Sequence, residues 1–224
     1  MQLHELDTQG RTLLACTLKE GVVEGPFEQW GPGGEHHLRA NFRAGQLQGP
    51  LALHDAAGAP MQACHYEAGR LHGVMHVFAD GQCVSQQHYV QGVLHGPATA
   101  FDAVGRPAAR LQFIAGRLTG PCEYFHEGRR VRLAHYKAGL LEGESTDFAA
   151  DGQVLQSCTY RANRLHGPLR RFGPGGELLQ ETHYRMGVPM TASGPPQAPG
   201  APATATLAGP AALLERLRRW ARGA

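Results

Sequence analysis

Two histidines four residues apart, His72 and His76, are the first residues in the sequence whose types and spacing could support chemistry. They lie in the stretch YEAGRLHGVMHVFADG, residues 66–81, together with two aromatic residues and three glycines. Paired imidazoles at this spacing could form half of a metal site or part of a hydrolase pocket. Similar stretches begin at Tyr89 and Tyr160, however. The pattern is therefore periodic, and the elements that carry it must be identified before any chemistry is assigned.

The repeat is 23 or 24 residues long, and each copy is marked by an aromatic or apolar residue that we call the anchor. The anchors are Leu18, Phe42, Tyr66, Tyr89, Phe113, Tyr136, Tyr160 and Tyr184. A first glycine follows each anchor by three residues, with Asn163 as the one exception, and a second glycine follows seven of the anchors by seven residues. A third glycine closes each unit, and the two shorter units lose their residue just before it. Asn tolerates positive φ and length variation marks a turn, so the chain is expected to reverse at the first and third glycines.

Segments of about eight residues, such as LQSCTYR and LHGPLRRF, lie between these turns, a length that suits strands and is too short for helices. One repeat is therefore expected to be one β-hairpin. Seven repeats predict roughly 14 strands and, at about 4.8 Å per strand, a sheet near 65–70 Å long. The predicted fold class is all-β, an elongated single twisted antiparallel sheet of about seven stacked hairpins over residues 1–189. The second glycine is expected to make room for a neighbouring aromatic against the backbone.

The unit, approximately Y-x-x-G-x-L-x-G-P-x-x-x-F-x-x-x-G, resembles the second type of MORN repeat over residues 6 to about 189. That repeat is found in bacterial proteins described as YwqK-type antitoxins of toxin–antitoxin systems. The resemblance implies a twisted sheet of stacked hairpins that serves as an interaction scaffold. It also implies a role in neutralising a toxin encoded nearby, and it brings no catalytic residue with it.

Seven of the 13 histidines are placed by the repeat. Three precede the second glycine (His72, His95 and His166), and four precede an anchor (His65, His88, His135 and His183). A residue next to an inward-facing anchor points to the opposite face of a strand, so a solvent-facing row of histidines is expected. A metal-binding or pH-sensitive face is the alternative that the pattern leaves open.

The cysteines Cys16, Cys64 and Cys158 each lie two residues before an anchor, on the anchor's own face, and are expected to be small buried core residues. Five cysteines without a CxxC pair favour reduced thiols in a cytoplasm. The start of the sequence does not read as a secretory signal, and no apolar run approaches the roughly 20 residues that span a bilayer.

Motifs for catalysis or cofactor binding are lacking: no GxSxG, HExxH, P-loop or Rossmann fingerprint is present. GPGGE occurs at both Gly31 and Gly173 and is interpreted as the same turn in two repeats. A formal net charge of +2 implies no general nucleic-acid surface. The sequence therefore predicts a cytoplasmic, non-enzymatic protein without catalytic, cofactor-binding or metal-ligating residues.

The repeat stops after Tyr184 and is followed by two different segments. Residues 190–210 are rich in Pro, Ala and Gly and are expected to be a linker. Residues 211–222 are expected to form a basic amphipathic helix, with an apolar side of Leu213, Leu217 and Trp220 and basic residues that include Arg216 and Arg219. This helix could cap the sheet, bind a partner protein, or bind weakly to a membrane surface.

The function expected from these features is binding of a protein partner, a toxin or secreted effector encoded nearby, which the sheet neutralises by occlusion. The alternative is a peripheral membrane scaffold tethered by the basic helix. Specificity is expected at positions that change between repeats, and oligomeric state is left open. The candidate partner-binding residues are His72, His95, His166, Gln46, Arg70, Arg117, Leu213, Leu217, Trp220, Arg216 and Arg219.

Overall fold

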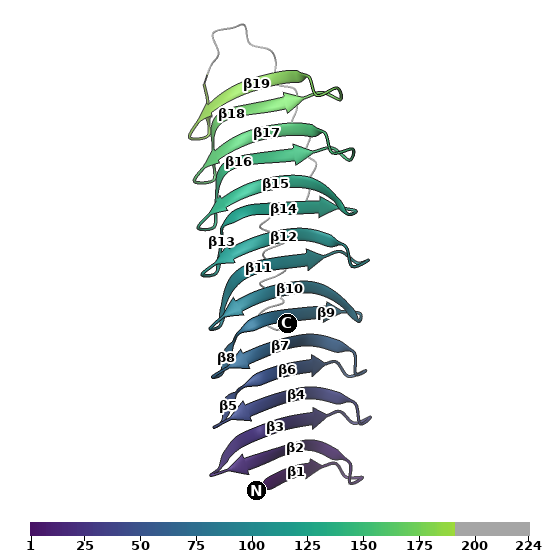
Figure 1. Cartoon of the computed structure of the whole chain (residues 1–224). Helices are drawn as coiled ribbons and strands as arrows, with labels where there is room; N and C mark the ends of the chain where they lie inside the picture. The colour runs from purple at the N-terminus through teal and green to yellow at the C-terminus, as the bar shows by residue number, and fades with distance from the viewer. Residues whose placement is uncertain (191–224) are drawn as a thin grey trace. The chain divides into compact units, whose positions relative to one another are not determined.

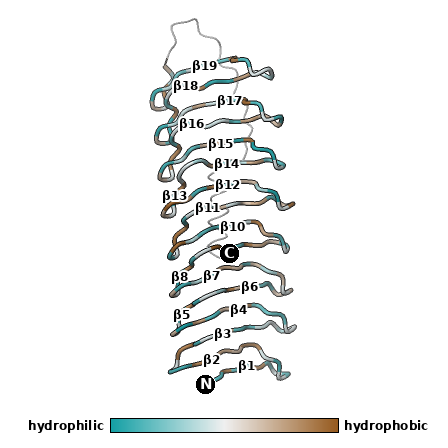
Figure 2. The backbone as a smooth tube through the Cα atoms, viewed as in Figure 1, coloured by the Kyte–Doolittle hydropathy of each residue, from teal (hydrophilic) through white to brown (hydrophobic). Residues whose placement is uncertain are grey.

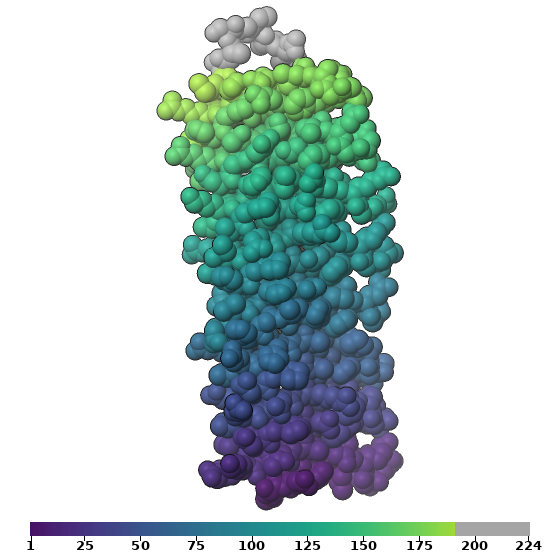
Figure 3. Space-filling view, viewed as in Figure 1, coloured from purple at the N-terminus to yellow at the C-terminus, as the bar shows by residue number. Residues whose placement is uncertain are grey.

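The structure, a computed structural model, describes residues 1–190, which form one open antiparallel β-sheet (Figure 1). Each strand pairs with the next one along the chain, from the first hairpin to the last. Each repeat therefore contacts mainly the repeats before and after it, as the successive colour bands of Figure 3 illustrate. The predicted all-β fold of stacked hairpins is confirmed. The expected linker and helix lie outside the described residues.

Two kinds of strand alternate in the sheet. Those that carry an anchor are β2 (Thr12–Lys19), β4 (His36–Arg43), β7 (Pro60–Glu67), β10 (Gln82–Val90), β12 (Pro107–Ile114), β15 (Arg129–Lys137), β17 (Val154–Arg161) and β19 (Leu178–Arg185). The return strands are β1 (Gln2–Leu6), β3 (Val22–Trp30), β5 and β6 (Gln46–Leu47 and Gly49–His54), β8 and β9 (Arg70–Leu71 and Gly73–Ala79), β11 (Val93–Phe101), β13 and β14 (Arg117–Leu118 and Gly120–His126), β16 (Leu140–Phe148), β18 (Arg164–Phe172) and β20 (Val188–Pro189).

The number of strands exceeds the roughly 14 predicted, because the sheet extends beyond the seven complete repeats at both ends. Three return strands are interrupted by one residue, at Gln48, His72 and Thr119, so 20 strand segments correspond to 16 continuous strands and the short β20. At about 4.8 Å per strand, 16 strands span roughly 72 Å.

The first glycine of each repeat is the second central residue of a two-residue turn. Both central residues have positive φ, for example 48° at Ala44 and 76° at Gly45, which is the requirement of the type I′ turn favoured in hairpins. Asn163 takes the same conformation with φ 65° after Ala162 with φ 47°. The predicted turn at this position, and the reason for Asn163, are confirmed.

The third glycine closes the opposite end of each hairpin, and here the two repeat lengths differ in turn type. In the longer repeats a three-residue loop ends in a glycine with positive φ, such as Gly105 with φ 79°. In that loop the N–H of Asp102 donates to the Arg106 carbonyl, and the Asp102 carboxylate accepts the N–H of Arg106. In the two shorter repeats the loop is a two-residue turn, Asp80–Gly81 or Glu127–Gly128, with positive φ at both residues. The loss of one residue thus changes the turn and leaves the strands in place.

The second glycine has a different role from the one expected. It does pair with the anchor of the next repeat, as in Gly96↔Phe113 and Gly143↔Tyr160. A Cβ added at Gly25, Gly73 or Gly120, however, would meet no atom within 4 Å, so no aromatic ring occupies the space there. The backbone at these glycines has positive φ, from 80° at Gly25 to 86° at Gly73. The expectation of space for an aromatic is wrong: glycine is required by the left-handed backbone of a β-bulge.

The core is a row of small side chains along the middle of one sheet face, which we call the anchor face because the anchors lie on it. Cys16, Cys64 and Cys158 are buried in this row, so the prediction for the cysteines is confirmed. The row continues through cross-strand neighbours such as Cys122↔Ala134. Hydrophobic and hydrophilic residues are interleaved along the strands (Figure 2), as expected for a sheet with one buried row.

Candidate protein-binding face

The edge formed by the type I′ turns is held together by hydrogen bonds between neighbouring repeats. The N–H of the first glycine donates to a carbonyl of the preceding repeat, as from Gly69 to Leu47 at 2.8 Å. The N–H one residue earlier donates to the side chain that precedes the second glycine of the preceding repeat. This second contact joins Ala44 to Glu24 Oε2 at 2.6 Å and Ala162 to Glu142 Oε2 at 2.8 Å.

The candidate histidines His72, His95 and His166 occupy this same position before the second glycine. The N–H of Ala115 donates to His95 Nδ1 at 3.5 Å, in the manner of the glutamates. His72 Nδ1 lies 3.3 Å from Glu67 Oε2, and His166 Nδ1 is buried without a hydrogen-bond partner among residues 1–190. Of these three histidines, His95 therefore contacts the turn of the next repeat in the way that Glu24 and Glu142 do. The described part of the chain also contains no group of three or more His, Cys, Asp or Glu placed to hold a metal ion.

The histidines that precede anchors lie on the opposite sheet face, which we call the histidine face. His88 and His135 are half-buried, and their Nδ1 atoms donate to backbone carbonyls of Pro97 at 3.0 Å and Glu144 at 2.9 Å. His65 and His183 are exposed. The expected solvent-facing row therefore applies only to the last two, because the bulge opposite His88 and His135 presents carbonyls that hold the rings.

The variable candidates Gln46, Arg70 and Arg117 each follow a type I′ turn directly and are exposed. The structure places them in one row along the turn edge. The remaining candidates, Leu213, Leu217, Trp220, Arg216 and Arg219, lie outside the described residues.

A cluster that sequence reasoning missed lies on the histidine face of β12, β14, β15 and β16. We call it the arginine–phenylalanine patch: Arg110, Glu123, Phe125, Arg130 and Phe148. The guanidinium of Arg110 lies 5.1 Å from the ring centroid of Phe125, and that of Arg130 lies 4.7 Å from the ring centroid of Phe148. Glu123 joins the two pairs, at 3.6 Å from Arg110 and 3.0 Å from Arg130.

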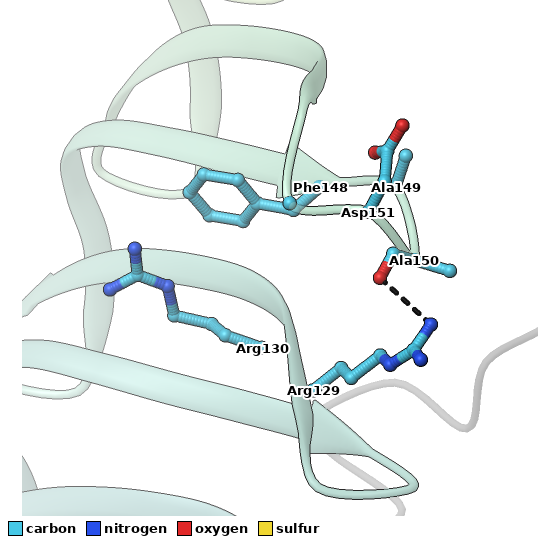
Figure 4. Close-up of a pocket in the computed structure, with 7 residues that line it drawn as sticks. Arg129, Arg130, Phe148, Ala149, Ala150 and Asp151 are labelled. Atoms are coloured by element: carbon cyan, nitrogen blue, oxygen red, sulfur yellow. Dashed lines mark hydrogen bonds between the residues drawn. The ribbon is translucent and has the colours of Figure 1, made fainter.

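Two cavities adjoin this patch and share Arg130. The larger, about 510 Å³, is lined by Pro97, Arg110, Gln112, Pro121, Glu123 and Leu133, among others. The smaller, about 290 Å³, lies between Arg129, Arg130, Phe148 and the loop 149–152. Figure 4 shows Arg130 extending toward the Phe148 ring, while Arg129 donates to the Ala150 carbonyl at 3.0 Å.

The electrostatics of the patch favour an acidic partner surface. Two guanidiniums face one carboxylate, which leaves one positive charge uncompensated, and 58% of the Arg110 side chain and 43% of the Arg130 side chain are exposed. Arginine stacked on an aromatic ring keeps its hydrogen-bond donors free for carboxylates. The feature of the sequence that could have indicated this patch is the aromatic residue that recurs before the third glycine. The arginine that contacts Phe125 is 15 residues away and the one that contacts Phe148 is 18 residues away, so only the strand register shows these pairs.

The anchor face carries a polar cluster around Arg132. Arg132 Nε lies 3.2 Å from Ser145 Oγ and 3.3 Å from Asp147 Oδ1. Burial raises the pKa of Asp147 above its ordinary value, although Arg132 partly offsets this, and burial also raises the pKa of Tyr160 to about 12. Burial likewise raises the pKa of the Cys122 and Cys158 thiols, which disfavours the nucleophilic thiolate.

Comparisons with known proteins add little to this description. No family model and no curated protein matches the chain. Among solved structures, a mutant of S. aureus TarM in complex with fondaparinux, alpha-GlcNAc-glycerol and UDP matches at 10% identity and a TM-score of 0.26, covering 53% of this chain and 19% of that one. A second TarM structure matches at 10% identity and a TM-score of 0.26, covering 57% of this chain and 21% of that one. The match thus spans about a fifth of the TarM chains.

Within residues 1–190, the structure contains no helix of the length and apolarity needed to cross a bilayer.

Proposed function

We propose that this chain is a non-enzymatic repeat protein that binds another protein through the arginine–phenylalanine patch. The patch carries this proposal because it combines the side chains that dominate binding energies at protein interfaces, arginine and aromatic residues, with adjoining cavities. A protruding side chain of the partner could enter the cavity beside Arg130.

The patch is also favourable because contacts within the sheet hold its side chains. Arg130 stacks on Phe148 and pairs with Glu123, and Arg129 is fixed by the Ala150 carbonyl. Side chains held in this way lose little conformational entropy on binding. They project from strands of a continuous sheet, which supports them better than a loop would.

The partner class we propose is a toxin or secreted effector, and its support is the resemblance of the repeat to the second MORN type. The mechanism is occlusion, in which the sheet covers the active site of the toxin. Because the patch carries a net positive charge, we propose that the surface it covers on the toxin is acidic.

The proposal is tested by capture from the native bacterium with the tagged full-length chain, read by mass spectrometry. The patch variant carries Arg130→Ala and Phe148→Ala. The matched control carries Arg39→Ala, which removes an arginine paired with Glu28 at 3.6 Å on the histidine face near the N-terminus. A partner held by the wild type and the control, but not by the patch variant, supports the patch. A partner held equally by all three contradicts it.

The antitoxin role needs a second readout. The gene of the captured partner is expressed alone and together with this chain, and cell growth is followed. Growth arrest that the wild type relieves and the patch variant does not relieve supports neutralisation. A partner that is harmless when expressed alone contradicts the toxin hypothesis. A variant with Leu213, Leu217 and Trp220 changed to Ser tests the alternative of recognition by the C-terminal segment.

A further inference from the structure

The two end strands of the sheet have open edges that complement each other. At one end, β20 pairs with Tyr184 and Arg185 of β19, and the N–H of Met190 bonds to the His183 carbonyl. Among residues 1–190 nothing pairs with that edge of β19 before His183. At the other end, β1 pairs with β2 on one side, and its other side is unpaired within the same residues. Such edges present rows of free N–H and C=O groups to another strand.

The hydrogen bonds of β1 show which of its groups face the open edge. Met1 and Leu18 exchange both backbone hydrogen bonds, at 2.7 Å each. In an antiparallel pair the bonded residues alternate, so Leu3 and Glu5 also point toward β2. The N–H and C=O groups of Gln2 and His4 consequently point outward.

The hydrogen bonds of β19 likewise show which of its groups face the open edge. The N–H of Met190 donates to the His183 carbonyl at 2.7 Å, which places that carbonyl on the side away from β18. By alternation, the N–H and C=O of Glu181 also face the open edge. Glu181 and His4 therefore each offer one free donor and one free acceptor.

The register of the repeat makes His4 and Glu181 partners. Throughout the array, the residue three before an anchor pairs with the residue ten after an anchor, as in Ser157↔Arg170 and Arg170↔Glu181. His4 occupies the second kind of position, since it pairs with Ala15, three before Leu18. Glu181 is three before Tyr184 and lacks its second partner among the described residues.

Side chains at the two ends fit this register. Leu178 pairs with Phe172 of β18 and is 52% exposed. The residue that would continue this row is Leu6 of β1, which is 55% exposed. In the same alignment Glu181 lies across from His4, and both residues are on the histidine face. The Glu181 carboxylate is held in place there by Arg170 Nε at 2.7 Å and His183 Nε2 at 2.8 Å.

We propose that the open edge of β19 binds β1 of a second copy of this chain, head to tail, with Glu181 opposite His4. Because the two edges are different, the interface is heterologous, and each added copy offers a new β19 edge. The sheet then continues from one copy into the next, and the arginine–phenylalanine patch is repeated along it at a fixed interval.

The first test is sedimentation velocity of the full chain across a range of concentrations. We expect assemblies larger than a monomer that grow with concentration and are abolished by His4→Pro. That proline removes an N–H that β2 does not use, so the β1–β2 hairpin is retained. The matched control is Thr8→Pro, at the loop position where another repeat has Pro32. A chain that stays monomeric throughout, or assembles equally well as His4→Pro, overturns the proposal.

The second test reports the register. One preparation carries Glu5→Cys and another carries Gln180→Cys, since the proposed alignment places these positions directly opposite each other across copies. Under mild oxidation we expect a disulfide dimer only when the two are mixed. Replacing Gln180→Cys by Leu178→Cys moves the thiol two positions along β19 and should reduce the yield at least tenfold. Equal yields from both mixtures, or dimers from one preparation alone, overturn the head-to-tail register.

Discussion

Arg130 and Phe148 form a cation–π pair across two neighbouring strands, with the guanidinium 4.7 Å from the ring centroid. The same guanidinium donates to Glu123 at 3.0 Å, so one side chain of β15 is fixed by β14 and by β16. An arginine held on both sides has less conformational entropy to lose when a partner binds, and we therefore place this pair at the centre of the proposed binding patch.

Changing Phe148→Leu is expected to weaken partner binding about tenfold, because loss of a cation–π contact costs roughly 1–2 kcal/mol. The measurement is calorimetric titration of the captured partner with each purified full-length chain. The matched control is Phe78→Leu, which alters the equivalent aromatic where it stacks on His76 at 6.3 Å and not on an arginine. An equal loss of affinity in both variants would show that the patch has no special role.

Replacing Asn163→Gly is expected to destabilise the protein, although glycine occupies this position in the other repeats. The backbone there has φ 65°, which glycine adopts easily, but Asn163 Oδ1 also accepts the N–H of Leu141 at 2.6 Å. Loss of that hydrogen bond should cost about 0.5–1.5 kcal/mol in the free energy of unfolding, measured in urea. Asn163→Asp keeps the acceptor and should retain most of the stability. A glycine variant as stable as the wild type would show that the Asn163 side chain does not stabilise the fold.

The fold could be predicted from the sequence because each turn has its own glycine, and a glycine or Asn163 at positive φ is visible as a residue type. The change of loop length at Gly81 and Gly128 was visible for the same reason. The role of the second glycine was not, because a bulge and a close aromatic contact both demand glycine. Only the φ of residues such as Gly96 distinguishes them.

The candidate site was less predictable, because binding residues come together across strands. The sequence left open a metal-binding role for the histidines that include His95. In the structure, His95 Nδ1 accepts the N–H of Ala115, which lies 20 residues later in the chain. Arg110 and Arg130 have no periodic pattern that marks them. Their importance depends on Phe125 and Phe148, which the hairpin register brings beside them.

Substitutions at His95 should show whether this residue stabilises the turn through a hydrogen bond or binds a metal ion. Gln48 occupies the equivalent position and accepts the N–H of Ala68 at 3.0 Å, so His95→Gln is expected to leave the unfolding free energy nearly unchanged. His95→Leu removes the acceptor and should cost roughly 0.5–1 kcal/mol, at the low end because the turn is exposed. Urea denaturation with and without added zinc is the measurement. Stabilisation by zinc that is lost in His95→Gln would instead establish a metal site.

Two aspartates should affect stability in opposite directions with pH. Burial, partly offset by Arg132, raises the pKa of Asp147 above its ordinary value of 3.8. The folded state therefore binds this proton more tightly than the unfolded state. The free energy of unfolding therefore increases as the pH falls through the folded pKa of Asp147. Above that pKa the buried carboxylate is fully charged and destabilises the protein by its full amount. Asp147→Asn should consequently stabilise the protein at neutral pH, by less than about 1 kcal/mol because solvent screens a partly exposed group.

Asp102 is the matched control, because its pKa is lowered. Burial acts to raise this pKa, but hydrogen bonds from the Arg106 and Val104 N–H groups and from the Arg106 guanidinium outweigh it. Its contribution to stability is present above the ordinary pKa of 3.8 and is lost as pH falls through the lower folded value. Asp102→Asn should therefore destabilise the protein at neutral pH, and the difference from the wild type should shrink in acid. Carboxyl ¹³C NMR titration checks both: the midpoint of Asp147 should lie above that of a reference peptide and the midpoint of Asp102 below it, and the reverse order would contradict this account of the two sites.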